Sequence, residues 1–252
     1  MTSVQPAATA TRDRTVNLPR ARLVERFDYT DDLMVIKLEP QGFEFNFKPG
    51  QYCTLGLDGI ERAYSIVSAP HEPLLEIFVE LVPDGELTPR MWRMDVGDTM
   101  SIRPRAKGIF LMDRSATQHL MLGTVTGVAP YISIVRDYLH RGHAGHHFYI
   151  LEGASYLDEF VYDVELSGLA AEYAETVSFV PAVSRPTESR NSAWAGETGR
   201  LNNIVAAYLD KFDLNRDDTL IYACGHPGMI ESSREIVTAA GWRWTEERFW
   251  KE

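Results

Sequence analysis

The first part of the chain alternates short apolar runs with turn residues. Residues 34–38 and 74–82 are rich in β-forming side chains, as expected of strands. Gly and Pro turn signals lie between such runs, at Pro49-Gly50, Asp58-Gly59, Pro83-Asp84-Gly85 and Val96-Gly97-Asp98. Several short strands at this spacing, from about Arg20 to Asp113, predict a small antiparallel β-barrel.

After residue 113 the pattern changes to alternating strands and helices. Apolar runs at residues 119–122, 148–151, 177–183 and 220–224 predict four strands. Helical spacing of apolar residues predicts helices over 130–141, 159–169 and 201–212, and a further helix that opens at Pro227. This alternation predicts a parallel sheet with helices on both faces. The polar segment 186–199 is expected to be a mobile loop.

The predicted fold class is therefore an antiparallel β-barrel followed by an α/β domain. A chain of 252 residues is long enough for two domains. We expect a disordered tail over residues 1–17, the barrel over 18–113 and the α/β domain over 114–252. The small and polar residues of the first ten positions lack the apolar core of a secretory signal.

Composition narrows the classes of function. No run of about 18 apolar residues is present, so we expect no membrane-spanning helix and a cytoplasmic protein. Cys53 and Cys224 are too few for a disulfide scaffold or for an iron–sulfur cluster with its four ligands, so an electron carrier must be an organic cofactor or a separate protein. A formal net charge of −11 disfavours nucleic-acid binding.

A basic group and a histidine group each have an ordinary explanation as solvated surface. Arg103, Arg105 and Lys107 form a basic group, which is either a solvated face or a docking surface for an acidic partner. The histidines at 140, 143, 146 and 147 flank a Gly-containing turn, so a solvated loop is favoured over a metal site and no bound metal is expected.

The most specific motif is Arg62-Ala63-Tyr64-Ser65, which follows Pro49-Gly50-Gln51-Tyr52 at short range. An Arg can bind a pyrophosphate with two parallel hydrogen bonds, and an aromatic ring two residues later on a strand lies on the same face. A hydroxyl beside that ring can hydrogen-bond a ring nitrogen. Taken alone, the motif fits equally a strand with an ion-paired Arg and a packed Tyr.

A second motif, residues 123–130, lies between a predicted strand and a predicted helix. It reads Gly-Thr-Val-Thr-Gly-Val-Ala-Pro. A turn of this kind presents backbone amides and a helix N-terminus to a diphosphate.

With these motifs, the chain from about Arg22 to Trp250 resembles the ferredoxin–NADP reductase family, especially its bacterial flavodoxin/ferredoxin reductases. The resemblance implies that Arg62 holds the FAD pyrophosphate, that Tyr64 lies against the isoalloxazine, and that Ser65 hydrogen-bonds near N5. It also implies FAD contacts from the Gly85-Glu86-Leu87-Thr88 turn, including the Thr88 hydroxyl, and an aromatic tail stacked on FAD. The implied FAD residues are Arg62, Ala63, Tyr64, Ser65, Phe78, Val79, Glu86, Leu87, Thr88, Thr126, Phe249 and Trp250.

The resemblance also implies a nicotinamide site in the second domain. The Cys224-Gly225-His226-Pro227 turn lies beside the nicotinamide in this family, so Ser65, Tyr64 and Cys224 are the expected catalytic residues. The implied NADP residues are Thr124, Val125, Thr126, Gly127, Ser184, Arg185, Arg200, Cys224 and Gly225. The family usually has Gly where this chain has Val125. A β-branched residue resists positive φ and crowds a phosphate, so either the loop is displaced or the dinucleotide binds more weakly.

Residues that discriminate NADPH from NADH point in two directions. Ser155 stands where NADPH-using relatives have Arg, and Glu152 precedes it, which favours NADH. Arg185 and Arg200 match family residues that bind the 2′-phosphate, which favours NADPH, and Arg190 is able to replace the lost cation.

The resemblance implies an FAD-dependent oxidoreductase that takes a hydride from NADPH, with NADH as a possible donor. Its electron partner is expected to be a ferredoxin or flavodoxin, and the protein is expected to be a monomer. Two alternatives stay open. One is an NADH-dependent reductase of an oxygenase component or of free flavin, and the other is an FAD-binding redox sensor with little turnover.

Overall fold

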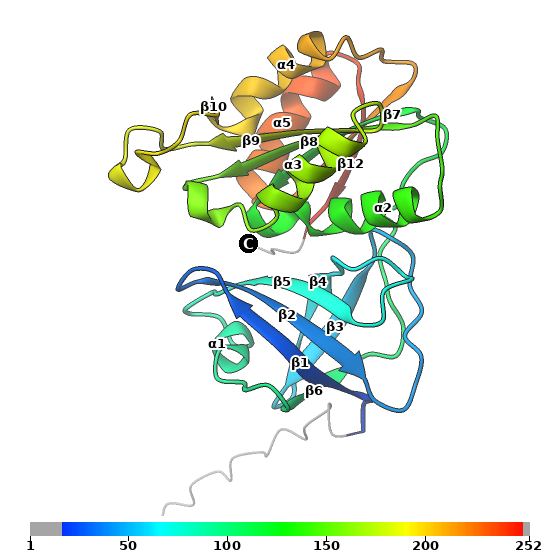
Figure 1. Ribbon diagram of the computed structural model, residues 1–252, viewed down its shortest axis with the longest axis vertical. Helices are drawn as coiled ribbons and strands as arrows, with labels where there is room; N and C mark the ends of the chain where they lie inside the picture. Colours follow the sequence, from blue (N-terminus) through cyan, green and yellow to red (C-terminus); the bar gives the residue numbers. More distant parts are fainter. Residues whose placement is uncertain (1–16, 249–252) are drawn as a thin grey trace, which may run out of the picture.

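The computed structural model describes residues 17–248 and contains two sheets, one in each half of the chain (Figure 1). Six antiparallel strands form the first sheet in the order β4-β3-β6-β1-β2-β5, and its ends β4 and β5 contact each other. A short helix, α1 (Thr88–Met91), precedes the last strand. The strands are β1 (Arg20–Asp28), β2 (Leu33–Pro40), β3 (Tyr52–Leu57), β4 (Ile60–Ser65), β5 (Leu75–Glu80) and β6 (Thr99–Ile102).

The second sheet has six parallel strands in the order β10-β9-β8-β7-β11-β12. They are β7 (Gln118–Thr124), β8 (His147–Ala154), β9 (Val177–Val183), β10 (Glu197–Thr198), β11 (Thr219–Cys224) and β12 (Arg243–Glu247). Between them lie α2 (Ala129–His140), α3 (Asp163–Glu172), α4 (Leu201–Lys211) and α5 (Pro227–Ala239) and the 3₁₀ turns η1 (Val125–Val128), η2 (Leu157–Glu159) and η3 (Ser189–Asn191).

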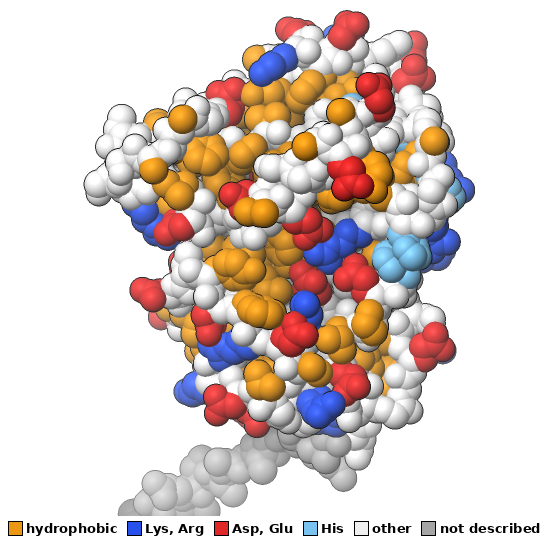
Figure 2. All heavy atoms as spheres, viewed as in Figure 1, with side chains coloured by type: hydrophobic (Ala, Val, Ile, Leu, Met, Phe, Trp, Pro, Cys, Tyr) orange, Lys and Arg blue, Asp and Glu red, His pale blue; other side chains and the backbone are white. Residues whose placement is uncertain are grey.

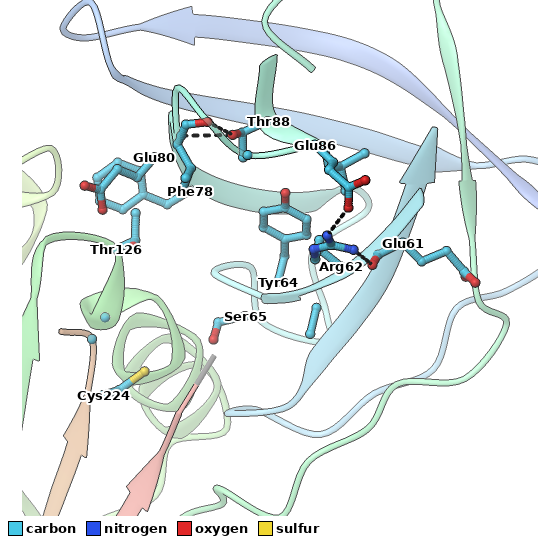
Figure 3. Close-up of a pocket in the computed structure, with 16 residues that line it drawn as sticks. Glu61, Arg62, Tyr64, Ser65, Phe78, Glu80, Glu86, Thr88, Thr126 and Cys224 are labelled. Atoms are coloured by element: carbon cyan, nitrogen blue, oxygen red, sulfur yellow. Dashed lines mark hydrogen bonds and ion pairs between the residues drawn. The ribbon is translucent and has the colours of Figure 1, made fainter. Parts of the chain in front are cut away.

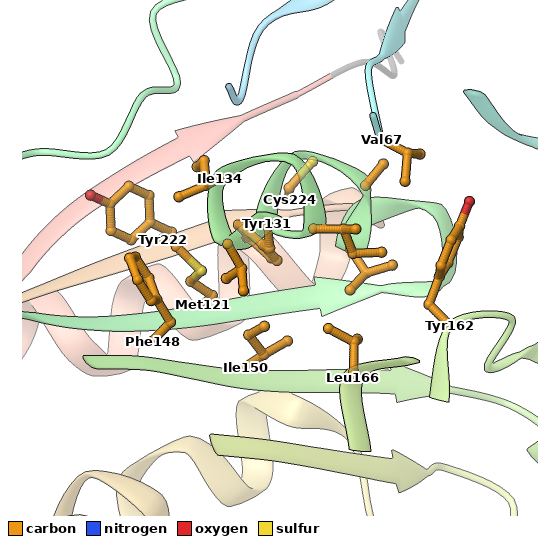
Figure 4. Close-up of a cluster of buried hydrophobic side chains, with 14 of the residues drawn as sticks. Val67, Met121, Tyr131, Ile134, Phe148, Ile150, Tyr162, Leu166, Tyr222 and Cys224 are labelled. Carbon is orange, nitrogen blue, oxygen red and sulfur yellow. The ribbon is translucent and has the colours of Figure 1, made fainter. Parts of the chain in front are cut away.

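Alternate residues of the parallel strands face opposite layers of helices. Met121 and Ile150 pack with α2 and α3, whereas Leu120 and Leu151 pack with α4 and α5. Figure 4 shows the α2 layer, with Tyr131 and Ile134 above Met121 and Phe148. The fold class predicted from the sequence is therefore confirmed.

Two segments of the second domain differ from the sequence expectation. The helix expected from residue 159 begins at Asp163, because the Glu159 carboxylate accepts hydrogen bonds from the amides of Ser155 and Tyr156 at 2.8 and 3.1 Å and closes η2 instead.

The polar segment 186–199, expected to be a mobile loop, contains η3 and β10. The buried side chain of Asn191 holds it in place. This amide accepts a hydrogen bond from the Leu157 amide at 2.8 Å, and it donates to the carbonyls of Ser155 and Arg185 at 2.9 Å. The segment is thus pinned to the carboxyl ends of β8 and β9.

The two domains share a hydrophobic cluster and a charged network. Phe78 and Phe110 of the first half pack in one cluster with Tyr131 of α2. Arg136 of α2 is ion-paired with Glu76 of β5 and with two further carboxylates, and Figure 2 shows charged side chains of both signs along this seam. Within residues 17–248, no helix is both long and apolar enough to cross a bilayer.

Candidate functional site

A cleft between the domains consists of two adjoining hollows of about 570 and 940 Å³. The first lies between β4, β5, the 82–88 turn and the edge of the second sheet, and Figure 3 shows its lining. The second lies over the carboxyl ends of β7, β8, β9 and β11. Glu80, Thr126 and Gly225 line both hollows. The cleft is therefore continuous from one domain to the other.

Strand β4 places the Arg62-Ala63-Tyr64-Ser65 motif along the first hollow. The guanidinium of Arg62 is ion-paired with the Glu86 carboxylate at 2.7 Å, and it also donates to the Glu61 carbonyl at 2.8 Å. The Tyr64 ring packs against the barrel core, and its hydroxyl donates to the sulfur of Met91 at 3.3 Å. Burial raises the pKa of Tyr64, so its hydroxyl stays protonated. Ser65 faces the Cys224 side of the hollow (Figure 3).

The turn after β5 lies beside Arg62. Its Thr88 hydroxyl was expected to donate a hydrogen bond to the pyrophosphate, but in the structure it donates within the turn. This hydroxyl accepts from the Val82 amide at 2.9 Å and donates to the Val82 carbonyl at 3.2 Å. Thr88 therefore closes the turn on itself, although it lines the hollow together with Gly85, Glu86 and Leu87.

Strand alternation separates the two β5 residues that were expected to contact FAD. Phe78 lines the first hollow and packs edge-on against Tyr162 at 5.6 Å. The Val79 side chain points the other way, into the barrel core, and does not line either hollow. The next residue on the cleft side is Glu80, which sequence reasoning missed although period-2 alternation from Phe78 predicts it.

Carboxylates are more numerous in the first hollow than the sequence analysis indicated. Glu61 is held by two hydrogen bonds from Arg103 at 2.7 and 2.6 Å, so the charge of Arg103 is already paired within the protein. Burial raises the pKa of Glu80, and the nearby carboxylates of Asp32 and Glu159 raise it further.

The turn after β7 packs directly on the turn after β11. A Cβ atom at Gly127 would lie 2.2 Å from the Cys224 carbonyl oxygen, so only Gly fits there. The Thr124 hydroxyl accepts a hydrogen bond from the His226 amide at 2.7 Å. These contacts bring Thr124, Gly127, Cys224 and Gly225 to the middle of the cleft.

Val125 keeps the backbone conformation that a Gly would adopt, with φ at +46°. The turn is therefore formed despite the β-branched side chain, whose cost in this region is about 1–2 kcal/mol. Its side chain packs against the cluster of Ala154, Phe160 and Val183, which holds the residue in this conformation. Val125 lines the second hollow.

Cys224 ends β11 with its side chain at the first hollow and is 1% exposed. Burial raises the pKa of the thiol, and the adjacent Glu247 raises it further, so the side chain is a neutral thiol and not a thiolate. This state suits packing against an apolar ring better than nucleophilic chemistry.

Two arginines near the second hollow contact Tyr156, an aromatic residue that the sequence analysis did not single out. Arg185 and Arg200 line this hollow together with Ser184. Arg185 donates to the Tyr156 hydroxyl at 2.8 Å, and the guanidinium of Arg190 lies 4.2 Å from the centre of the Tyr156 ring. Both arginines also pair with carboxylates, Arg185 with Glu188 and Arg190 with Asp158.

Glu152, which suggested a carboxylate for a ribose hydroxyl, does not line the cleft. It is fully buried on the α2/α3 side of β8, and neither carboxylate oxygen has a hydrogen-bond partner in the described part of the chain. Its position three residues before Ser155 therefore does not favour NADH.

The start of α5 lies at the cleft, whereas the expected aromatic tail is not part of the described structure. The N-terminus of α5 opens on the second hollow through Pro227 and Gly228, and His226 caps it by accepting from the Gly228 amide at 3.0 Å. Pro at a first helical position was the sequence signal for this contribution. Phe249 and Trp250, the expected aromatic tail, lie outside the described residues.

Comparisons with known proteins fit this arrangement. Residues 121–235 match the family described as Oxidoreductase NAD-binding domain. Ferredoxin–NADP reductase A of Sorangium cellulosum is 30% identical over 234 residues, which cover 87% of this chain and 82% of that protein. Protein RfbI of Salmonella typhimurium is also 30% identical, over 81% of this chain, but the match spans only 59% of its own length.

A solved structure shows the same fold. The ferredoxin NADP+ reductase of Neisseria gonorrhoeae with bound FAD and NADP superposes with a TM-score of 0.80 at 23% identity, over 92% of this chain and 98% of that one. The sequence match to the Sorangium protein extends through both domains and the cleft between them. The chain therefore belongs to the ferredoxin–NADP reductase family, whose members are NAD(P)-dependent flavin oxidoreductases.

Proposed function

We propose that this protein binds FAD in a barrel domain of residues 18–113 and NADPH in an α/β domain of residues 114–252, and that it transfers electrons to a ferredoxin or flavodoxin. The observation that carries the proposal is the continuous cleft. It sets the Arg62–Ser65 motif of β4 opposite Thr126, Cys224 and Gly225 of the second domain.

The lining of the first hollow fits FAD. Arg62 is a cation for the pyrophosphate, Tyr64 and Phe78 are aromatic walls, and Ser65 has a hydroxyl at the inner end. When bound, FAD accepts a hydride from the nicotinamide and releases electrons one at a time. The residues of the chain supply placement. Ser65 and the neutral Cys224 side chain approach the same space from opposite domains and orient the two rings.

The second hollow fits a dinucleotide pyrophosphate. The Thr124–Gly127 turn lines it, and the N-terminus of α5, whose helix dipole favours an anion, opens on it. Arg185 and Arg200 support NADPH, because a 2′-phosphate requires cations. Arg190 does not itself line this hollow, but its guanidinium lies 4.2 Å from the ring centre of Tyr156, the neighbour of Ser155, and we expect it to replace the cation that Ser155 lacks. The acidic neighbours Asp158 and Glu188 weaken this preference but do not abolish it.

The surface proposed for the electron partner is smaller than the basic group in the sequence. Arg105 and Lys107 are exposed and not ion-paired with a described carboxylate, whereas Arg103 is bound to Glu61. Two residues after Lys107, Ile109 is 95% exposed. An exposed apolar residue beside two cations suits an acidic redox protein.

Anaerobic reduction of the purified protein by NADPH and NADH, followed at the flavin absorbance band, tests the proposal. We expect rapid bleaching that is faster at low NADPH than at low NADH, and subsequent reoxidation by a ferredoxin or flavodoxin. Faster reduction by NADH, with electrons passing to free flavin or an oxygenase component, would favour that alternative acceptor. Bound FAD that stays oxidised with both nucleotides would indicate a redox sensor and would overturn the reductase proposal.

A further inference from the structure

The first hollow has an unusual charge balance for a site that binds a diphosphate. Among the described residues that line it, Arg62 is the single cation, and Glu61, Glu80 and Glu86 are carboxylates. The carboxylate of Glu86 lies 2.7 Å from the Arg62 guanidinium, in the position of an anionic ligand (Figure 3). The cation that a pyrophosphate requires is therefore already engaged by the protein.

We propose that Glu86 competes with the FAD pyrophosphate for Arg62, so that FAD binds only when this ion pair opens. The inference rests on the proposed function, since it takes FAD as the ligand of this hollow. Glu86 then sets the affinity of the site and makes FAD an exchangeable ligand, held less tightly than the same hollow would hold it with a neutral residue at position 86.

The other two carboxylates are not suited to this role. Glu61 is fixed by two hydrogen bonds from Arg103 and its side chain is 18% exposed. Glu80 lies at the inner end of the hollow, where it joins the second one, and makes no ion pair with Arg62. By contrast, the Glu86 side chain is 65% exposed and the Arg62 side chain 52%, so this pair can separate into solvent.

A second cation lies within reach of the displaced carboxylate. Arg90, on the first turn of α1, donates a hydrogen bond to the backbone carbonyl of Glu86 and pairs with Asp58 at 3.2 Å. Since the Arg90 guanidinium already contacts the backbone carbonyl of Glu86, the Glu86 carboxylate has a second cation close by once it leaves Arg62. FAD binding thus exchanges one exposed ion pair for another, and the competition lowers affinity without blocking the site.

Equilibrium binding to flavin-free protein tests the inference without any turnover. We expect Glu86→Gln to tighten FAD about 2- to 5-fold, the range of an exposed ion pair. Riboflavin lacks a phosphate, so its dissociation constant should not change. The matched control is Asp84→Asn, which removes a carboxylate from the same turn at an exposed position outside the hollow and should leave both ligands unaffected.

A double-mutant cycle locates the effect at Arg62. In an Arg62→Ala background Glu86→Gln should no longer tighten FAD, because the contested cation is gone. Unchanged or weaker FAD binding by Glu86→Gln overturns the inference, as does an equal gain in Asp84→Asn or for riboflavin. If the unsubstituted protein binds no FAD at all, the proposed function itself fails, which is a separate result.

Discussion

At the scale of single residues, Glu152 is the side chain least compatible with its surroundings. It is 0% exposed, and both carboxylate oxygens lack a partner among the described residues. Burial raises its pKa well above the ordinary 4.5, and the charge of Asp163 raises it further. Because the folded state holds this proton more tightly than the unfolded chain, protonation of Glu152 contributes to the free energy of unfolding at low pH. This contribution is lost as pH rises from the unfolded pKa towards the folded pKa, by about 1.4 kcal/mol per pH unit.

We therefore predict that Glu152→Leu is more stable than the unsubstituted protein at pH 8, by about 1–3 kcal/mol, since it removes an unpaired buried polar group. The gain should shrink towards pH 5. Thermal unfolding at several pH values measures both trends. Glu152→Gln is the matched control, because it keeps a polar group but cannot titrate. If the stability of all three proteins changes with pH in the same way, Glu152 does not take up a proton when the chain folds.

Val125 gives a second residue-scale prediction. Its φ of +46° costs energy that Gly would not incur, and Val125 lines the second hollow, where we propose that the dinucleotide binds. Val125→Gly should tighten dinucleotide binding about 3- to 10-fold, because the amides of the turn become more accessible, for a change of about 1 kcal/mol. Titration with oxidised NADP measures it. Weaker binding by this variant would mean that the packing of Val125 on Phe160 is needed to shape the turn.

At the scale of elements, the strands and helices with strong apolar periodicity were predictable. The strand over Val177–Val183 and the helix that opens at Pro227 match the sequence expectation. Strand β12 was not expected, because Arg-Trp-Thr-Glu-Glu has too few apolar residues for a strand pattern. Among the described strands it lies at the edge and pairs only with β11, so its formation depends on tertiary contacts that no local pattern encodes.

The network between β5, α2 and α3 is also beyond sequence reasoning, because its members are far apart in the chain. Arg136 lies 2.7 Å from Glu165 and 3.3 Å from both Glu72 and Glu76, and the Tyr162 hydroxyl donates to Glu76 at 2.6 Å. These contacts connect the two domains on the side of the cleft where Phe78 packs on Tyr162.

We predict that Arg136→Met lowers the free energy of unfolding by about 3 kcal/mol, because it leaves the buried Glu76 carboxylate without its cation. Arg141→Met is the control. Arg141 pairs with Asp137 at 2.8 Å, with side chains 53% and 14% exposed, so its loss should cost less than that of Arg136, about 1 kcal/mol. Urea unfolding of both variants measures the difference. Equal effects would mean that the network adds nothing beyond a surface ion pair.

At the scale of the whole molecule, the sequence motifs predicted many of the residues that line the cleft. The Arg62–Ser65 segment lies on β4 and the Thr124–Gly127 segment forms the turn after β7, and both segments line the cleft. The charges around them were not predictable. Whether Arg62 faces Glu86, or Arg103 faces Glu61, depends on how the barrel closes, and Glu152 lies in the interior instead of the cleft because of its face on β8.

The proposed docking surface can be tested on the intact protein. Replacing both Arg105 and Lys107 by Glu should lower kcat/KM for a ferredoxin about 10-fold at low ionic strength, with a smaller loss at high salt. Reduction of the small acceptor ferricyanide should not change. Lys211→Glu, an exposed charge reversal at the end of α4, is the control. A loss that is independent of salt, or shared by ferricyanide, would contradict docking at this surface.

The parallel pairing of β12 with β11 has a practical consequence for handling the protein. Glu247 is level with Cys224 in the register, and its carboxylate lies 3.4 Å from where a Cβ of Gly108 would stand. An affinity tag or fluorescent reporter fused behind residue 248 would thus begin close to Cys224, which lines the first hollow. Strand β1 starts at the far end of the barrel (Figure 1). Purification handles belong before β1, whereas a reporter of cleft occupancy belongs after β12.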